Sequence, residues 1–205
     1  MSYGPNPWHQ QHWDARAATN FMAGGAGSGL IVCTALAGIS GLEAGTGAGT
    51  APVWPGPWPF VLGAALVGLG LFAVWLEIGR PLRALNVFLH PKTSWMTREA
   101  FAGAALIAAV LAALLWPSVP ALSALAGLAA LAFVYCQGRI LRAARGIPAW
   151  REPLVVPLVV STGLAEGAGL WGLLQAGDAP HATAPATLLL LAAANRDSRE
   201  FPDGD

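Results

Sequence analysis

The chain has 205 residues, of which 55 % are hydrophobic and 11 % are charged, and its formal net charge is zero. A soluble domain carries about 25 % charged residues, so this composition excludes an ordinary soluble protein and indicates one that lies in a lipid bilayer. We expect no nucleic-acid partner.

Five long apolar runs follow one another along the chain. They cover residues 21–42, 58–78, 100–116, 119–138 and 153–174. A helix needs about 20 apolar residues to cross the hydrocarbon of a bilayer, and it satisfies its own backbone hydrogen bonds there. A sixth run, 186–194, has nine residues and covers less than half of the bilayer.

The predicted fold is therefore all-α, a polytopic transmembrane helix bundle of five spans plus a partial sixth. An N-terminal interfacial segment, residues 1–20, precedes the bundle of residues 21–194, and a polar tail, residues 195–205, follows it. Because the sixth run is so short, we expect the C-terminus to be truncated.

Small residues crowd the predicted spans, as in AGGAGSG (23–29) and GLAEGAG (163–169). Glycine and alanine let transmembrane helices approach each other closely, so we expect these segments to be sites of helix packing. At the start of the first span, Asp14 or Asn20 is expected to cap the helix.

Basic residues predict the orientation of the bundle. Eight of the eleven lie in the two loops that follow the second and fourth spans. They are Arg80, Arg83, Lys92, Arg98, Arg139, Arg142, Arg145 and Arg151. The positive-inside rule places both loops, and the N-terminus with them, in the cytoplasm. Trp58, Trp116 and Trp171 lie near span ends on the opposite side, and we expect them to form an aromatic belt at the interface.

Few side chains in the spans are suited to electron or proton transfer. All four His lie outside the spans, and Cys33 and Cys136 are isolated, so we expect no haem or iron–sulfur cluster here and two small buried thiols. Glu77, at the basic end of the second span, and Glu166, inside the fifth, could exchange protons with a ligand. Equally, Glu77 could pair with Arg80 at the helix end, and Glu166 could hydrogen-bond to a neighbouring helix.

Three segments resemble the DmsC/NrfD-type membrane anchors of molybdopterin oxidoreductases. They are WDARAATNFMAGGAGSGL (13–30), EIGRPLRALNVFLHPKTSWMTRE (77–99) and IPAWREPLVVPLVVSTGL (147–164). The G-R-P-x-R-A stretch followed by S-W-x-x-R-E is the most specific part. The N-terminal SYGPNPWHQQHWDARAA is most similar to anchors of the phenylacetyl-CoA:acceptor oxidoreductase type. Members of the family usually have more helices than this chain.

The resemblance implies an anchor in the bacterial cytoplasmic (inner) membrane that holds an iron–sulfur subunit and a molybdopterin catalytic subunit. It would exchange electrons with menaquinone or ubiquinone, and its partners would supply the molybdopterin and the clusters. This chain would contribute no catalytic residue and no metal. The candidates for quinone binding or proton transfer are then Glu77, Arg80 and Glu166. The residues expected to dock the partner are Arg83, His90, Lys92, Trp95, Arg98, Arg142 and Arg145.

Two other interpretations remain open. A small proton-coupled transporter or channel could use Glu166 as its coupling residue, although the sequence shows no internal repeat of the kind transporters have. Pro157, the interior helix breaker of the fifth span, lies near the helix start, where proline is tolerated. The other interpretation is a shortened anchor that inserts into the membrane and binds nothing.

Overall fold

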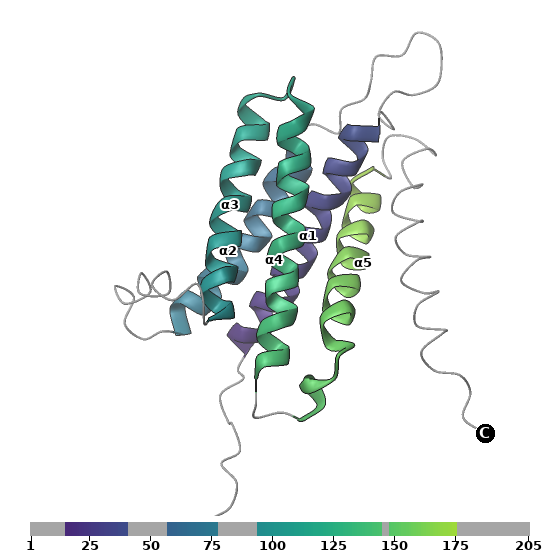
Figure 1. Ribbon diagram of the computed structural model, residues 1–205. Helices are drawn as coiled ribbons and strands as arrows, with labels where there is room; N and C mark the ends of the chain where they lie inside the picture. Colours follow the sequence, from purple (N-terminus) through teal and green to yellow (C-terminus); the bar gives the residue numbers. More distant parts are fainter. Residues whose placement is uncertain (1–14, 41–56, 78–93, 145–147, 176–205) are drawn as a thin grey trace, which may run out of the picture.

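A computed structural model describes residues 15–40, 57–77, 94–144 and 148–175 (Figure 1). The described part is all helical and contains five helices that are long and apolar enough to cross a membrane. They are α1 (Ala15–Ser40), α2 (Trp58–Glu77), α3 (Trp95–Leu115), α4 (Pro120–Ala143) and α5 (Val155–Gln175), with a short 3-10 helix, η2 (Pro148–Arg151), before α5. The predicted all-α bundle of five spans is confirmed, while the sixth run and the polar tail lie outside the described residues.

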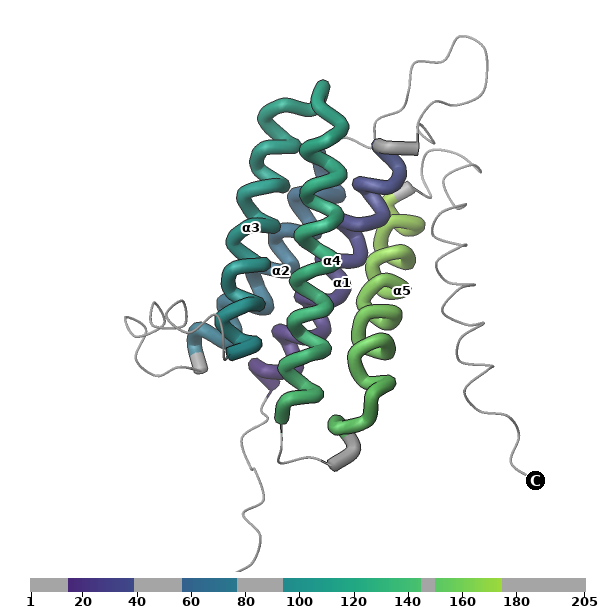
Figure 2. The backbone as a smooth tube through the Cα atoms, viewed as in Figure 1, coloured from purple at the N-terminus to yellow at the C-terminus, as the bar shows by residue number. Residues whose placement is uncertain are grey.

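The helices run up and down beside one another, with α1 at the centre (Figures 1 and 2). Helix α1 packs against α2, α4 and α5, and α3 packs against α4. α1, α3 and α5 begin at the same end of the bundle, where α2 and α4 finish. We call this end the basic end, because the basic loops of the sequence join the helices there.

Two helix starts differ from the predicted ones. Helix α1 begins at Ala15 and α3 begins at Trp95, so both extend into segments that were expected to precede the spans. Of the two predicted caps, Asn20 is wrong, because it is the sixth residue of α1, and Asp14 lies outside the described residues. The expectation for Pro157 is confirmed, since it lies in the first turn of α5.

Two clusters of buried side chains form the interior. The larger joins α1, α2, α3 and α4 through Ile31, Phe60, Val67, Leu106, Val110 and Phe133, among others. The smaller lies between α1 and α5 and contains Cys33 and Trp171. The prediction of an interfacial belt is therefore wrong for Trp171, whose ring is buried. The prediction for the thiols is confirmed, because Cys33 and Cys136 are free and buried.

Glycine pairs set the distance between α1 and α5. Gly25 and Gly29 of α1 face Gly163 and Gly167 of α5, so two G-x-x-x-G stretches meet. A Cβ atom on Gly25 would stand 3.4 Å from the Cα of Gly163, and one on Gly167 would collide with the backbone of Gly29 and Leu30. Lipid and the protein interior are equally apolar, so such close backbone packing drives helix association in place of the hydrophobic effect. This confirms the packing role predicted for the small residues.

We predict that Gly167→Ala destabilises the bundle by about 1–3 kcal/mol, as overpacking of a well-filled interior usually does. The added methyl group would have to push α5 away from the backbone of α1. Gly169→Ala is the matched control, because a Cβ at Gly169 meets no atom within 4 Å. Thermal unfolding of the detergent-solubilised variants gives the measurement. Equal melting temperatures for the two variants would contradict the packing described above.

Candidate functional site

A polar cluster lies inside the bundle near its basic end and joins three helices. The side-chain amide of Asn20 on α1 donates to Oε1 of Glu99 on α3 over 3.1 Å. The amide of Gln137 on α4 donates to the backbone carbonyl of Asn20 over 2.9 Å. The exposed fractions of Asn20, Glu99 and Gln137 are 3 %, 5 % and 0 %. The cluster therefore holds a carboxyl group away from solvent, with hydrogen bonds that cross between helices.

Local sequence places Glu99 on the buried side of α3. Ser94 caps this helix: its backbone is extended and its hydroxyl accepts a hydrogen bond from the backbone N–H of Thr97 over 3.4 Å. With the helix start fixed there, Glu99 lies on the same stripe as Gly103 and Leu106, which are buried. Residues four and seven apart share one face of a helix, so the carboxyl group points inward once the cap includes Glu99 in the helix.

Glycines make room for the amide groups of the cluster. A Cβ at Gly24 would stand 2.5 Å from Nε2 of Gln137, and one at Gly70 would stand 3.0 Å from Oδ1 of Asn20. Helices α1 and α2 can therefore close around the two amides only because these positions lack side chains. Larger residues at either position would exclude the amide that now fills the space.

Two acceptors of the cluster lack a donor within the described part of the structure. They are Oδ1 of Asn20 and Oε1 of Gln137, and both atoms are buried. Buried acceptors normally receive a hydrogen bond. A proton carried by Glu99, or a hydroxyl group of a bound ligand, could supply it. The cluster is thus suited to take up a proton from a ligand that carries hydroxyl groups.

The end of α2 lies beside the start of α1, close to this cluster. Arg16 donates from Nη1 to the backbone carbonyl of Leu76 over 3.3 Å. Leu76 precedes Glu77, with which α2 ends, and Asn20 lies one turn beyond Arg16 on α1. The structure thereby brings the helix end that carries Glu77 to the end of the bundle that contains Glu99. The side chain of Glu77 lies outside the description, as do Arg80, Arg83, His90, Lys92 and Arg145.

An aromatic and guanidinium stack occupies the same end between α3 and α4. The guanidinium carbons of Arg98 and Arg139 lie 4.1 Å and 4.3 Å from the ring centroid of Trp95. Arg139 also donates to the hydroxyl of Tyr135 over 2.9 Å. Cation–π contacts of this kind hold a guanidinium in place. Of the predicted docking residues, Trp95 and Arg98 thus share one half-buried stack, whereas Arg142 is exposed.

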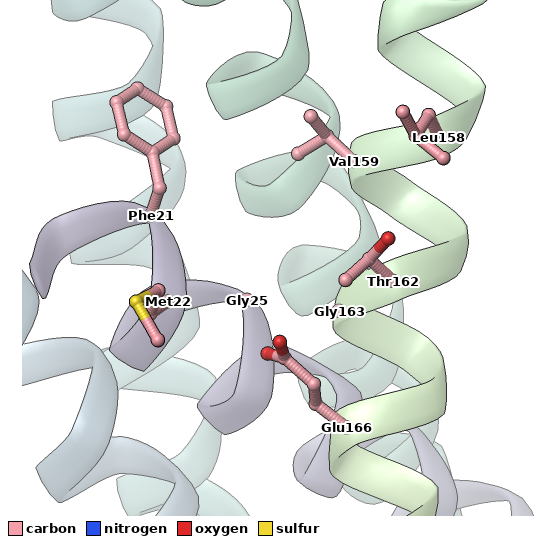
Figure 3. A pocket seen from close by; sticks show the side chains of 8 residues that line it. All are labelled: Phe21, Met22, Gly25, Leu158, Val159, Thr162, Gly163 and Glu166. Atoms are coloured by element: carbon pink, nitrogen blue, oxygen red, sulfur yellow. The ribbon is translucent and has the colours of Figure 1, made fainter. Parts of the chain in front are cut away.

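Glu166 lies in a different part of the molecule. Its carboxyl group points from the middle of α5 towards α1 and lines a hollow of about 210 Å³ on the outer face of the bundle (Figure 3). The other residues of the hollow are Phe21, Met22, Gly25, Leu158, Val159, Thr162 and Gly163. At 1.5 Å per residue, Glu166 is about 16 Å from the start of α5. The structure does not bring it to the helix end where Glu77 lies.

No family model matches the chain, and no curated protein matches it. The five candidate spanning helices of the described part indicate a membrane protein.

The sequence did not predict the cluster as a site. The third predicted span began at Ala100, which left Glu99 in a loop, and neither Gln137 nor the buried position of Asn20 was predicted. One available signal was Ser94, a favourable capping residue placed five positions before Glu99. Another was the single amide of Gln137 in an otherwise apolar helix segment.

We predict an energetic coupling of about 0.5–2 kcal/mol between Asn20 and Glu99. Asn20→Ala and Glu99→Ala each remove the hydrogen bond between α1 and α3, so the double variant should be little less stable than the worse single variant. Reversible unfolding in mixed detergent micelles measures the three free energies of unfolding. Thr19→Ala is the control, since the Thr19 hydroxyl donates only within its own helix, to the carbonyl of Ala15. Strictly additive effects would contradict the coupling.

Proposed function

We propose that this chain is the membrane anchor subunit of a molybdenum and iron–sulfur oxidoreductase complex and that it binds quinone or quinol. The observation that carries the proposal is the Asn20–Glu99–Gln137 cluster, which holds a carboxyl group inside the bundle. Its residues lie about 6–9 Å from the helix ends, at the depth of a quinone ring that enters from the membrane. The resemblance of residues 77–99 to DmsC/NrfD-type anchors supports the class of complex.

The chemistry proposed for the cluster is proton transfer coupled to electron transfer. Oxidation of a quinol to a quinone releases two electrons and two protons. Glu99 accepts one proton from a ring hydroxyl and the second proton passes to water at the basic end, while the amides of Asn20 and Gln137 orient the ring oxygens. The electrons pass to an iron–sulfur cluster of the partner subunit. Quinone reduction follows the reverse course, and the relative potentials of the two redox couples decide the direction.

The proposal also includes the quinone-site and docking residues that were predicted from the sequence. Glu77 is the last residue of α2, which ends near the cluster, and Arg80 follows it three residues later in the sequence; both are proposed to border the quinone ring. Glu166 is a second proton-transfer candidate within the span. The partner iron–sulfur subunit would dock on the basic end, where the molybdopterin subunit would join it. The proposed docking surface comprises Arg83, His90, Lys92, Arg142 and Arg145, with Trp95 and Arg98 at its membrane edge.

A transporter or channel that uses Glu166 is not the function we propose. The carboxyl group of Glu166 lines a hollow between α1 and α5 on the outer face of the bundle. It does not belong to the buried core that joins α1, α2, α3 and α4. Transporters place their coupling residue where discontinuous helices meet near the midplane, and α5 runs without interruption from Val155 to Gln175.

The first test is purification of the tagged full chain from its native cells in a gentle detergent. We expect an iron–sulfur subunit and a molybdopterin subunit to co-purify, with molybdenum and iron detected by elemental analysis. Recovery of the chain without either subunit or metal would refute the anchor function.

The second test addresses Glu99 in the purified complex. Glu99→Gln keeps an acceptor for Asn20 but cannot take up a proton, so quinol oxidation should fall at least about 100-fold, as expected for loss of a general base. The matched control is Glu152→Gln, which changes an exposed carboxyl group near η2 and should leave the rate unchanged. Co-purification of both partners with the Glu99 variant establishes that the complex has assembled. An assembled variant with the wild-type rate would rule out Glu99 as the proton acceptor.

The third test concerns orientation in the bacterial inner membrane. A green fluorescent protein fused after Lys92 should fluoresce, and an alkaline phosphatase fused after Ser118 should be active, because the basic loops are proposed to be cytoplasmic. The reverse pattern would place the basic end, and with it the partner subunits, on the other side of the membrane.

A further inference from the structure

The stack of Trp95, Arg98 and Arg139 gathers two guanidinium groups around one indole ring. They lie 4.1 Å and 4.3 Å from the ring centroid. The two charged groups are therefore less than about 9 Å apart, close enough for one anion to interact with both.

The stack also lies at a particular depth. Trp95 is the first residue of α3, and Arg139 lies one turn before Ala143, the last residue of α4. These positions are close to the ends of two candidate membrane spans. The phosphate groups of phospholipids lie at this level, just outside the hydrocarbon.

An apolar strip leads from the stack towards the middle of the bundle. On α4, Leu125, Leu128, Tyr135 and Arg139 lie on one side of the helix, and the first three are at least 41 % exposed. On α3, Phe101 lies one turn beyond Arg98 and is also exposed. The outer surface of α3 and α4 thus presents apolar side chains within the span and cationic side chains at its end. This order matches an acyl chain that ends in an anionic headgroup.

We propose that the Trp95–Arg98–Arg139 stack binds the phosphodiester headgroup of an anionic phospholipid, whose acyl chain lies along the exposed strip of α4. A guanidinium presents several N–H donors in one plane and can bind two phosphate oxygens at once. Tyr135 accepts one hydrogen bond from Arg139 and so fixes the direction of its remaining donors. The apolar strip favours a lipid over free phosphate or an acidic protein segment, because neither of these would cover it.

The experiment is a titration of the purified full chain, in a neutral detergent, with phosphatidylglycerol, followed by native mass spectrometry. Arg98→Gln and Arg139→Gln should each weaken binding about fivefold, the effect of about one interfacial charge. Arg142→Gln is the control, because Arg142 is exposed on the same helix and outside the stack; it should leave the affinity unchanged. Arg139→Lys keeps the charge without the planar fork and should weaken binding by less than Arg139→Gln. Circular dichroism confirms that each variant is folded.

Two further binding measurements distinguish an anionic lipid from the other possible ligands. Phosphatidylcholine has the same acyl chains but no net charge, and its binding should be equal in all variants. Inorganic phosphate should not compete with phosphatidylglycerol. Competition by inorganic phosphate would overturn the assignment to lipid, as would equal binding of phosphatidylglycerol by wild type and by folded Arg139→Gln. Variants that bind lipid normally but lose a co-purifying subunit would assign the stack to protein docking instead.

Discussion

The rest of the structure depends on how closely α1 can approach its neighbours. In hydrocarbon, burying an apolar side chain between helices gains little over leaving it against lipid, so contact distance decides which helices associate. Helix α1 meets α5 through Gly25 and Gly29, and it meets α2 through Gly27, where a Cβ would stand 2.5 Å from the carbonyl of Gly63. A central helix with glycine on several faces can hold its neighbours at backbone contact, and α1 is the most buried of the five spans.

The same lack of side chains creates the polar cluster. Gly24 and Gly70 leave the volume that the amides of Gln137 and Asn20 occupy, so tight packing and hydrogen bonding come from one set of positions. A carboxyl group and two amides inside a membrane bundle carry a free-energy cost that apolar residues of similar size would avoid. Polar groups retained in such a place usually serve a function, and this is why the proposal for proton transfer rests on Glu99.

The five spans of the described part could be predicted from the sequence, because hydropathy alone reports which segments can enter lipid. The inward faces could not, since lipid and protein interior are both apolar and the helices show no amphipathic stripe to read. Trp171 illustrates the failure: a Trp near a span end is typical of the interface, yet this one packs in the α1–α5 cluster. Glu99 illustrates a second failure. Hydropathy began the third span only after this charged residue, whereas the helix begins at the Ser94 cap and includes it.

The positions of the two carboxyl groups have different consequences for charge movement. Glu99 lies about 6 Å from the start of α3, and Glu166 lies about 16 Å from the start of α5, with both starts at the basic end. In the proposed anchor, a proton accepted by Glu99 would return to water at the basic end, where the electrons would also leave towards the partner, so the reaction would carry little net charge across the bilayer. A proton that reached Glu166 would cross about half of the hydrocarbon. In the proposed anchor, quinol oxidation therefore does not need Glu166, and a role for Glu166 would be required only if the reaction moved charge across the membrane.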